Sequence, residues 1–147
     1  YVGIGDYDTH GDQVGRYPVL MRELNHALSS FYEATVELGV SDKVTTFTAS
    51  EFGRTLTSNG DGTDHGWGSH QMVIGDGVRG GRIFGTMPEL AIGSNDDVGQ
   101  GRMIPTTSID QYAATLASWY GLSPSQIADT FPSLVNFNSA DIGFMQI

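Results

Sequence analysis

Two acid–histidine clusters contain the side chains of this chain that are best suited to hold a metal ion. Their candidate metal ligands are Asp8, His10, Glu51, Asp64, His65 and His70. Imidazoles combined with carboxylates suit zinc, manganese or iron, whereas carboxylates alone suit calcium or magnesium. Zinc is therefore the first expectation for a divalent ion, with calcium, magnesium or manganese as alternatives.

Each cluster follows a run of apolar or β-branched residues that predicts a strand. Residues 1–5 precede the first cluster, and residues 44–49 lead directly to Glu51. Between them, apolar residues spaced three and four apart predict a helix with Pro18 in its first turn and Gly39 just beyond its end. A strand, a helix and a strand in this order predict a right-handed parallel crossover. Loops at the carboxyl ends of such strands form the sites of open α/β sheets.

The rest of the chain is expected to add a long loop, short strands and two helices. The loop covers residues 52–69, and the strands are expected at residues 72–74, 82–84 and 103–106. Thr107 and Asp110 have the spacing of a capping box, and Ser123 followed by Pro124 is typical of a second helix start. The pattern predicts one α/β domain over residues 1–147, with a mostly parallel sheet flanked by helices.

Composition excludes several classes of function. Seven Lys+Arg against seventeen Asp+Glu give a formal net charge of −10, which argues against nucleic acid and anionic membranes as partners. The absence of cysteine excludes disulfides, thiolate zinc sites and cysteine nucleophiles. No apolar run approaches the roughly 18 residues of a membrane span. No signal-peptide pattern is visible in these residues.

Several other residues could take part in binding or catalysis, but each also has a structural explanation. Arg54 could hold an anionic substrate group in a bidentate contact, or it could pair with Glu51 or a nearby carbonyl. The run that starts at Asn59 is similar to an EF-hand loop, but His70 stands where the loop needs glutamate, so calcium binding of that kind is rejected. No Gly-x-Ser-x-Gly elbow is present. His26 lies opposite the apolar helix face, so it is expected outside any site.

Four motifs in order resemble the DUF1501 family. They occupy residues 5–10 (GDYDTH), 50–55 (SEFGRT), 62–66 (GTDHG) and 72–81 (MVIGDGVRGG), and residues 106–134 also resemble the family. DUF1501 proteins are grouped with the alkaline phosphatase and sulfatase superfamily, and many carry twin-arginine (Tat) export signals. The resemblance implies a periplasmic or secreted, metal-dependent hydrolase. It also implies that residues 1–147 resemble the C-terminal half of an alkaline phosphatase-like fold.

The resemblance implies roles for residues of the first cluster. The superfamily has an Asp and a His after one strand, and these resemble Asp8 and His10. Asp6 competes with Asp8, because Asp6 and His10 have the Asp-x-x-x-His spacing that is typical of phosphatases. The superfamily nucleophile lies in an N-terminal half that has no counterpart in these residues. A missing N-terminal segment, or another protein chain, is therefore expected to complete the fold and the site.

The second cluster departs from the superfamily at one position. Where the superfamily has Asp-His-Gly, this chain has Glu51 followed by Phe52, which cannot act as a ligand. At most one tightly bound ion is therefore expected. The last superfamily histidine fits His65 better than His70, and Glu51 and Asp64 are either ligands or partners of ligands.

Two functional hypotheses follow from the resemblance. The first is the metal-ligand-bearing half of an exported hydrolase of small phosphate or sulfate esters, with Arg54 as the catalytic anion clamp. The second is a non-catalytic exported or cell-surface protein that retains the fold, with or without a structural metal. Phe52 at a ligand position favours the second hypothesis.

Overall fold

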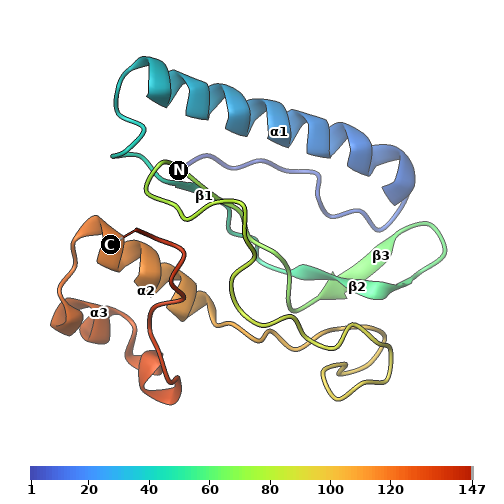
Figure 1. Cartoon of the computed structure of the whole chain (residues 1–147). Coiled ribbons are helices and arrows are strands. Elements are labelled where there is room, and N and C mark those ends of the chain that lie inside the picture. The colour runs from blue at the N-terminus through green and yellow to red at the C-terminus, as the bar shows by residue number, and fades with distance from the viewer. Residues whose placement is uncertain (147) are drawn as a thin grey trace.

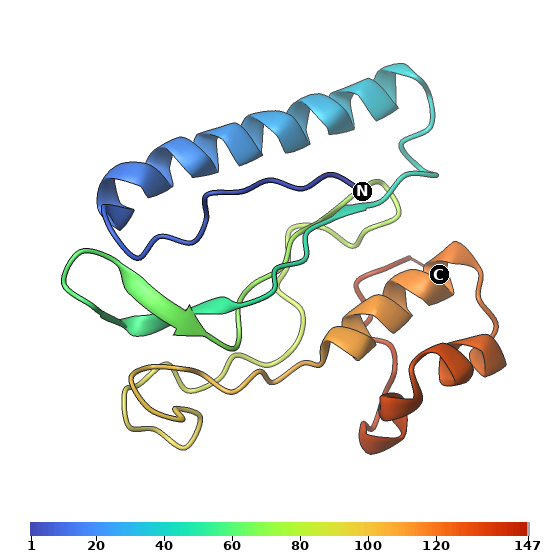
Figure 2. The same cartoon turned by 180° about the vertical axis from the view of Figure 1, so that it is seen from behind.

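The computed structural model describes residues 1–146. In chain order its elements are α1 (Gln13–Glu37), β1 (Thr46–Phe47), β2 (Gly53–Ser58), β3 (Thr63–Gly66), β4 (Val73–Ile74), α2 (Ile109–Tyr120), α3 (Pro124–Thr130) and the 3-10 helix η1 (Pro132–Asn136). Helix α1 lies along one side of the molecule, and α2 and α3 lie on the other side (Figures 1 and 2). The strands and long extended segments run between these helices.

The predicted parallel sheet is wrong. Within residues 1–146 the strands form two separate two-stranded sheets, β1 with β4 and β2 with β3, and both pairs are antiparallel. Residues 1–5 form no strand, and the side chains of Tyr1 and Val2 are exposed. Strand propensity reports a residue's fit to a pleated surface, but it specifies neither the partner nor its direction. The run at residues 44–49 therefore pairs with a segment that follows it, through Thr46 opposite Ile74.

A β-hairpin occupies the region that was expected to be a loop. Strands β2 and β3 pair Arg54 with His65 and Ser58 with Thr63, with an irregularity between these two pairs. The connection contains Asn59 followed by Gly60, whose φ of 109° suits glycine. Asn-Gly between strands is the strongest short hairpin signal in a sequence, and here it was the signal that could have located the hairpin.

The expected strands at residues 82–84 and 103–106 are not formed, and an acidic turn precedes the second of them. No strand is found at residues 82–84, and Met103 forms only a single antiparallel bridge, with Asp97. The carboxylate of Asp97 accepts backbone N–H bonds from Gly93, Gly99 and Gly101. These bonds, above all that from Gly93, lower the pKa of Asp97. An ionised side chain therefore organises this loop.

The helix boundaries follow the capping residues closely. Helix α3 begins as predicted, with Ser123 as N-cap and Pro124 in its first turn. Helix α2 has a capping box that starts one residue later than predicted, at Ser108, with Gln111 as the reciprocal partner. Helix α1 starts at Gln13, so Pro18 lies inside the helix instead of in its first turn.

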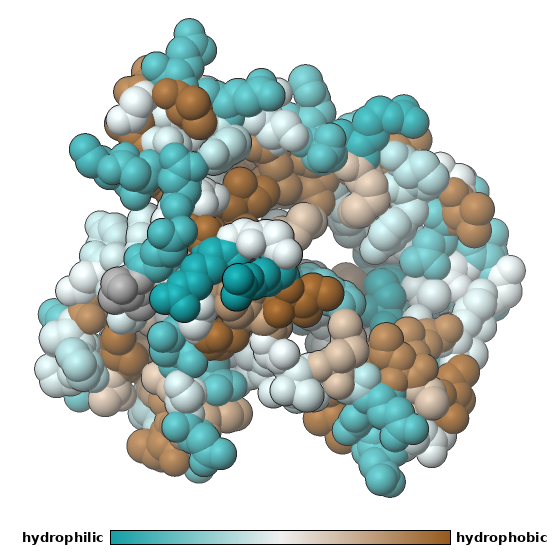
Figure 3. Space-filling model, in the orientation of Figure 1, coloured by the Kyte–Doolittle hydropathy of each residue, from teal (hydrophilic) through white to brown (hydrophobic). Residues whose placement is uncertain are grey.

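The hydrophobic core is small and lies around α2. Tyr112, Leu116, Phe144 and Met145 form its buried cluster. The Tyr112 hydroxyl donates to the carbonyl oxygens of Thr48 (3.1 Å) and Met72 (3.4 Å), which joins α2 to the segments around the β1–β4 sheet. Many apolar side chains are exposed, and hydrophobic residues reach the visible surface among hydrophilic ones (Figure 3). None of the helices within residues 1–146 combines the length and the hydropathy needed to cross a bilayer.

Polar contacts connect the C-terminal part of α1 to the rest of the molecule. On the predicted apolar face Leu20 is buried, but Phe31 is 52% exposed. The carboxylate of Asp76 accepts hydrogen bonds from the hydroxyls of Ser41 (2.5 Å) and Tyr32 (2.6 Å). These bonds, that of Ser41 first, lower the pKa of Asp76, and the bond to Asp76 raises the pKa of Tyr32. Asp76 therefore links α1 to the loop after β4.

We predict that Tyr112→Phe lowers the free energy of unfolding by about 1 kcal/mol at neutral pH, because it removes a partly buried hydrogen bond. Burial raises the pKa of Tyr112 to about 12 in the folded chain, above its model-peptide value near 10. The protonated hydroxyl therefore stabilises the fold below about pH 10, and this contribution is lost as the pH rises toward 12. In urea unfolding, the free energy of unfolding of Tyr112→Phe should therefore fall less over this pH range than that of wild type.

Tyr120→Phe is the matched control, because Tyr120 lies on the same helix with its side chain exposed. It should resemble wild type at every pH. If the free energy of unfolding of wild type and of Tyr112→Phe fell equally at alkaline pH, the raised pKa would not belong to Tyr112.

Candidate metal centre

Three of the predicted ligands meet in space. Asp8 and His10 come from the segment before α1, and His65 comes from β3. One potential ligand atom from each residue lies within 4.8 Å of the other two. The Nε2 atoms of His65 and His10 lie 2.9 and 3.1 Å from the same carboxylate oxygen, Oδ1 of Asp8. Two imidazoles and one carboxylate form a donor set that suits zinc.

The hairpin loop holds the segment before α1 in place. The side-chain amide of Asn59 donates to the carbonyl oxygen of His10 at 3.0 Å. The backbone N–H of Gln13 donates to the carbonyl oxygen of Asp61 at 3.1 Å. Gly62 allows the close approach, because a Cβ there would lie 2.3 Å from the carbonyl oxygen of Thr9. Contacts at the hairpin turn thus fix where Asp8 and His10 lie in space relative to His65.

Asp64 orients His10. Its Oδ1 atom lies 3.1 Å from Nδ1 of His10 and 3.2 Å from the amide nitrogen of Asn59. The bond from Asn59 and then that from His10 lower the pKa of Asp64, which keeps its carboxylate ionised. A carboxylate on one ring nitrogen fixes the tautomer of a histidine and directs the other nitrogen at a metal. Asp64 thus has the position of a ligand's partner, with Nε2 of His10 free to coordinate.

Arg54 binds the other side of Asp8. Its NH1 atom lies 2.6 Å from Oδ1 of Asp8, its Nε donates to Oγ1 of Thr63 at 3.0 Å, and its NH2 donates to the Thr63 carbonyl. The bond from Arg54 is the main cause of the lowered pKa of Asp8, followed by burial, which opposes it, and the bond to His65. The sequence suggested Glu51 or a nearby carbonyl as the partner of Arg54. In the structure Arg54 donates to the carbonyl of Thr63, and its carboxylate partner is Asp8 instead of Glu51.

Phe52 forms the wall of the site. Its ring stacks on the imidazole of His65, with centroids 3.9 Å apart and planes 11° apart. The Cζ atom of Arg54 lies 5.9 Å from the same ring. Phe52 therefore packs against one candidate ligand and limits how that ligand can turn.

The other predicted site residues lie outside this group. Glu51 and His70 are exposed, and neither belongs to the three-residue group that could share an ion. Asp6 lies near Arg16, with Oδ1 3.8 Å from NH2, so the rival to Asp8 has a different partner. His26 lies on α1 with an exposed side chain.

Sequence reasoning did not identify Asn59 and Thr63 as supports of the site. Asn59 connects the hairpin turn to His10 and Asp64, and Thr63 anchors Arg54. The Asn-Gly hairpin signal could have drawn attention to Asn59. No local signal indicates Thr63, because its role depends on the pairing of β2 with β3.

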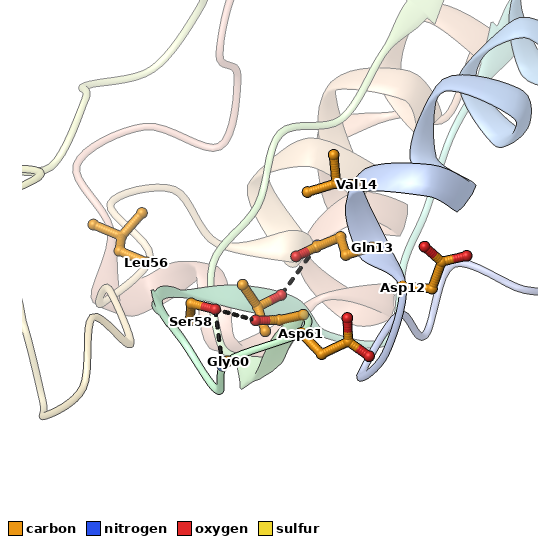
Figure 4. A pocket seen from close by; sticks show the side chains of 9 residues that line it. Asp12, Gln13, Val14, Leu56, Ser58, Gly60 and Asp61 are labelled. Atoms are coloured by element: carbon orange, nitrogen blue, oxygen red, sulfur yellow. Dashed lines mark hydrogen bonds between the residues drawn. The ribbon is translucent and has the colours of Figure 1, made fainter.

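A surface pocket of about 340 Å³ lies between the start of α1 and the β2–β3 hairpin (Figure 4). Its lining residues are Asp12, Gln13, Val14, Leu56, Ser58, Gly60, Asp61, Gly62 and Thr63. The Thr63 hydroxyl connects the pocket to the centre, because it accepts hydrogen bonds from both Gln13 and Arg54. The carboxylates of Asp12 and Asp61 repel anions, so an anionic ester is not expected to bind in this pocket.

Comparison with known proteins identifies a family. The model of the family described as "Protein of unknown function (DUF1501)" matches residues 1–131. This match spans most of the chain, which therefore belongs to the DUF1501 family. No curated protein and no solved structure matches the chain.

We predict that Asp64→Ala lowers the affinity for zinc about 10- to 100-fold, as loss of an outer-shell carboxylate does in other metal sites. The reason is that His10 loses the bond that orients its ring. Asp61→Ala is the matched control, because it removes a carboxylate from the same hairpin without a bond to a candidate ligand. Isothermal titration with zinc measures both variants. Equal affinities would show that Asp64 does not orient His10.

Proposed function

We propose that this DUF1501 protein holds one divalent cation, preferably zinc, and uses it in the hydrolysis of small phosphate or sulfate esters. Asp8, His10 and His65 would hold the ion. The observation that supports this most strongly is the approach of two Nε2 atoms to one carboxylate oxygen. The expectation of at most one ion agrees with the role of Phe52, which offers an aromatic face in place of a further nitrogen.

The donor set fits a catalytic ion. Three protein ligands leave a fourth position of a tetrahedral zinc open to substrate. The side chains of Asp8, His10 and His65 are 51%, 48% and 49% exposed, so a small substrate can reach them. A bound divalent ion polarises an ester oxygen and lowers the pKa of the attacking group. In this chain Asp64 orients His10, Phe52 fixes the plane of His65, and Arg54 keeps Asp8 ionised.

The family resemblance supports the class of reaction and the compartment that we propose. The motifs around Asp8, Glu51 and His65 are similar to metal-binding motifs of the alkaline phosphatase and sulfatase superfamily. On this proposal the protein is exported to the periplasm or secreted. The nucleophile of the superfamily would come from a further segment of the polypeptide or from another chain.

A second candidate function is a non-catalytic exported or cell-surface protein with a structural metal. Phe52 favours it, because an aromatic wall stabilises His65 without adding a ligand. Both candidates require zinc binding, and only the first requires hydrolysis.

We predict that the chain binds one zinc ion, with Asp8→Asn, His10→Gln and His65→Gln each weakening the binding strongly. The loss should exceed the roughly 10- to 100-fold typical of outer-shell partners, because a direct ligand is removed. Glu51→Gln, His70→Gln and His26→Gln are the controls and should bind zinc like wild type. Isothermal titration gives stoichiometry and affinity. Strong losses in the controls, or none in the three ligand variants, would assign the ion to different residues.

We expect the zinc-loaded protein, supplied with the complementing segment or chain, to hydrolyse p-nitrophenyl phosphate or p-nitrophenyl sulfate. A chelator should abolish the activity and added zinc should restore it, since the ion polarises the ester. The release of p-nitrophenol measures the rate, and His65→Gln serves as the inactive control. Zinc binding with no hydrolysis of either ester would favour the second candidate.

A further inference from the structure

Arg54 is fixed at the centre by contacts that do not involve the candidate metal ligands. Its Nε and NH2 atoms donate to the hydroxyl and the carbonyl of Thr63. Its side chain is 14% exposed, compared with about half for Asp8, His10 and His65. The guanidinium is therefore positioned in advance, with only its NH1 side directed at Asp8.

The NH1 atom of Arg54 contacts the same oxygen as the two imidazoles. Oδ1 of Asp8 lies 2.6 Å from NH1, 2.9 Å from Nε2 of His65 and 3.1 Å from Nε2 of His10. A cation that binds the imidazoles and this oxygen shares the oxygen with a guanidinium, which keeps its charge at every physiological pH. The contact therefore opposes the cation in two ways, by occupying the oxygen and by repelling positive charge.

The same arrangement favours an anion once a cation is bound. Two positive groups then lie on either side of one carboxylate, and the guanidinium has N–H groups in a planar fork that matches oxyanions. A tetrahedral oxyanion has enough oxygen atoms to contact the ion and the guanidinium together. A neutral ester gains little from the second contact.

We propose that Arg54 is the second cation of this centre, weakening the binding of the metal ion through Asp8 and giving a tetrahedral oxyanion its second contact. The inference rests on the proposed metal site and specifies the substrate group that the site takes. It makes Arg54 a specificity-determining residue with opposite effects on two ligands. A purely structural role would instead weaken the binding of both ligands when Arg54 is replaced.

The test compares the full chain with Arg54→Gln by isothermal titration, first with zinc and then with inorganic phosphate added to the zinc-loaded protein. We expect Arg54→Gln to bind zinc roughly 3- to 10-fold more tightly, because a positive charge beside Oδ1 of Asp8 is removed. We expect it to bind phosphate about 10-fold more weakly, because a charge-assisted contact is lost. Arg82→Gln, which removes an exposed arginine outside the centre, should leave both affinities unchanged.

Arg54→Lys keeps the test decisive if Arg54→Gln does not fold. It retains the charge but lacks the fork, so zinc affinity should stay within about 3-fold of wild type while phosphate affinity falls. Zinc binding that Arg54→Gln weakens or leaves unchanged would overturn the inference alone. So would phosphate binding that neither Arg54 variant reduces. Failure of the wild-type chain to bind zinc would overturn the proposed function and this inference together.

Discussion

The contact between the hairpin turn and the segment before α1 is the constraint on which the centre depends. Asp8 and His65 are 57 positions apart in the sequence, and no regular sheet joins the segments that carry them. They meet because Asn59 donates to the carbonyl of His10 and because Gly62 leaves room for the backbone at Thr9. Without this contact the three candidate ligands would belong to two unconnected segments, the one before α1 and strand β3.

Each candidate ligand is held by a residue that lies outside the donor set we propose. Asp64 holds His10, Phe52 holds His65, and Arg54 holds Asp8. This arrangement explains how a half-exposed group of polar side chains can keep a defined geometry at some distance from the small core around α2. It also makes the charge balance of the centre sensitive to salt, because exposed ion pairs are screened and contribute little in isolation.

The sequence identified residues that meet in the structure, but it did not predict the architecture that brings them together. Residue types and loop positions gave six candidate ligands that include Asp8, His10 and His65, and capping residues were enough to place the start of α3. The direction of strand pairing was not predictable, because it depends on contacts that local propensity does not encode. The hairpin was missed although Asn-Gly marked it, since the surrounding glycines and aspartates were interpreted as a loop. The family resemblance favoured His65 over His70, but only the fold shows that Glu51 and His70 lie outside the three-residue group.

X-ray absorption at the zinc edge of the zinc-loaded protein shows whether one ion is held by His10, His65 and Asp8. We expect a four-coordinate ion with two imidazole nitrogens and oxygen in the remaining positions, at about 2.0–2.1 Å. His70→Gln should leave this spectrum unchanged, and His65→Gln should remove one imidazole. A shell of oxygen atoms alone, or a third imidazole that His70→Gln removes, would rule out this set of ligands.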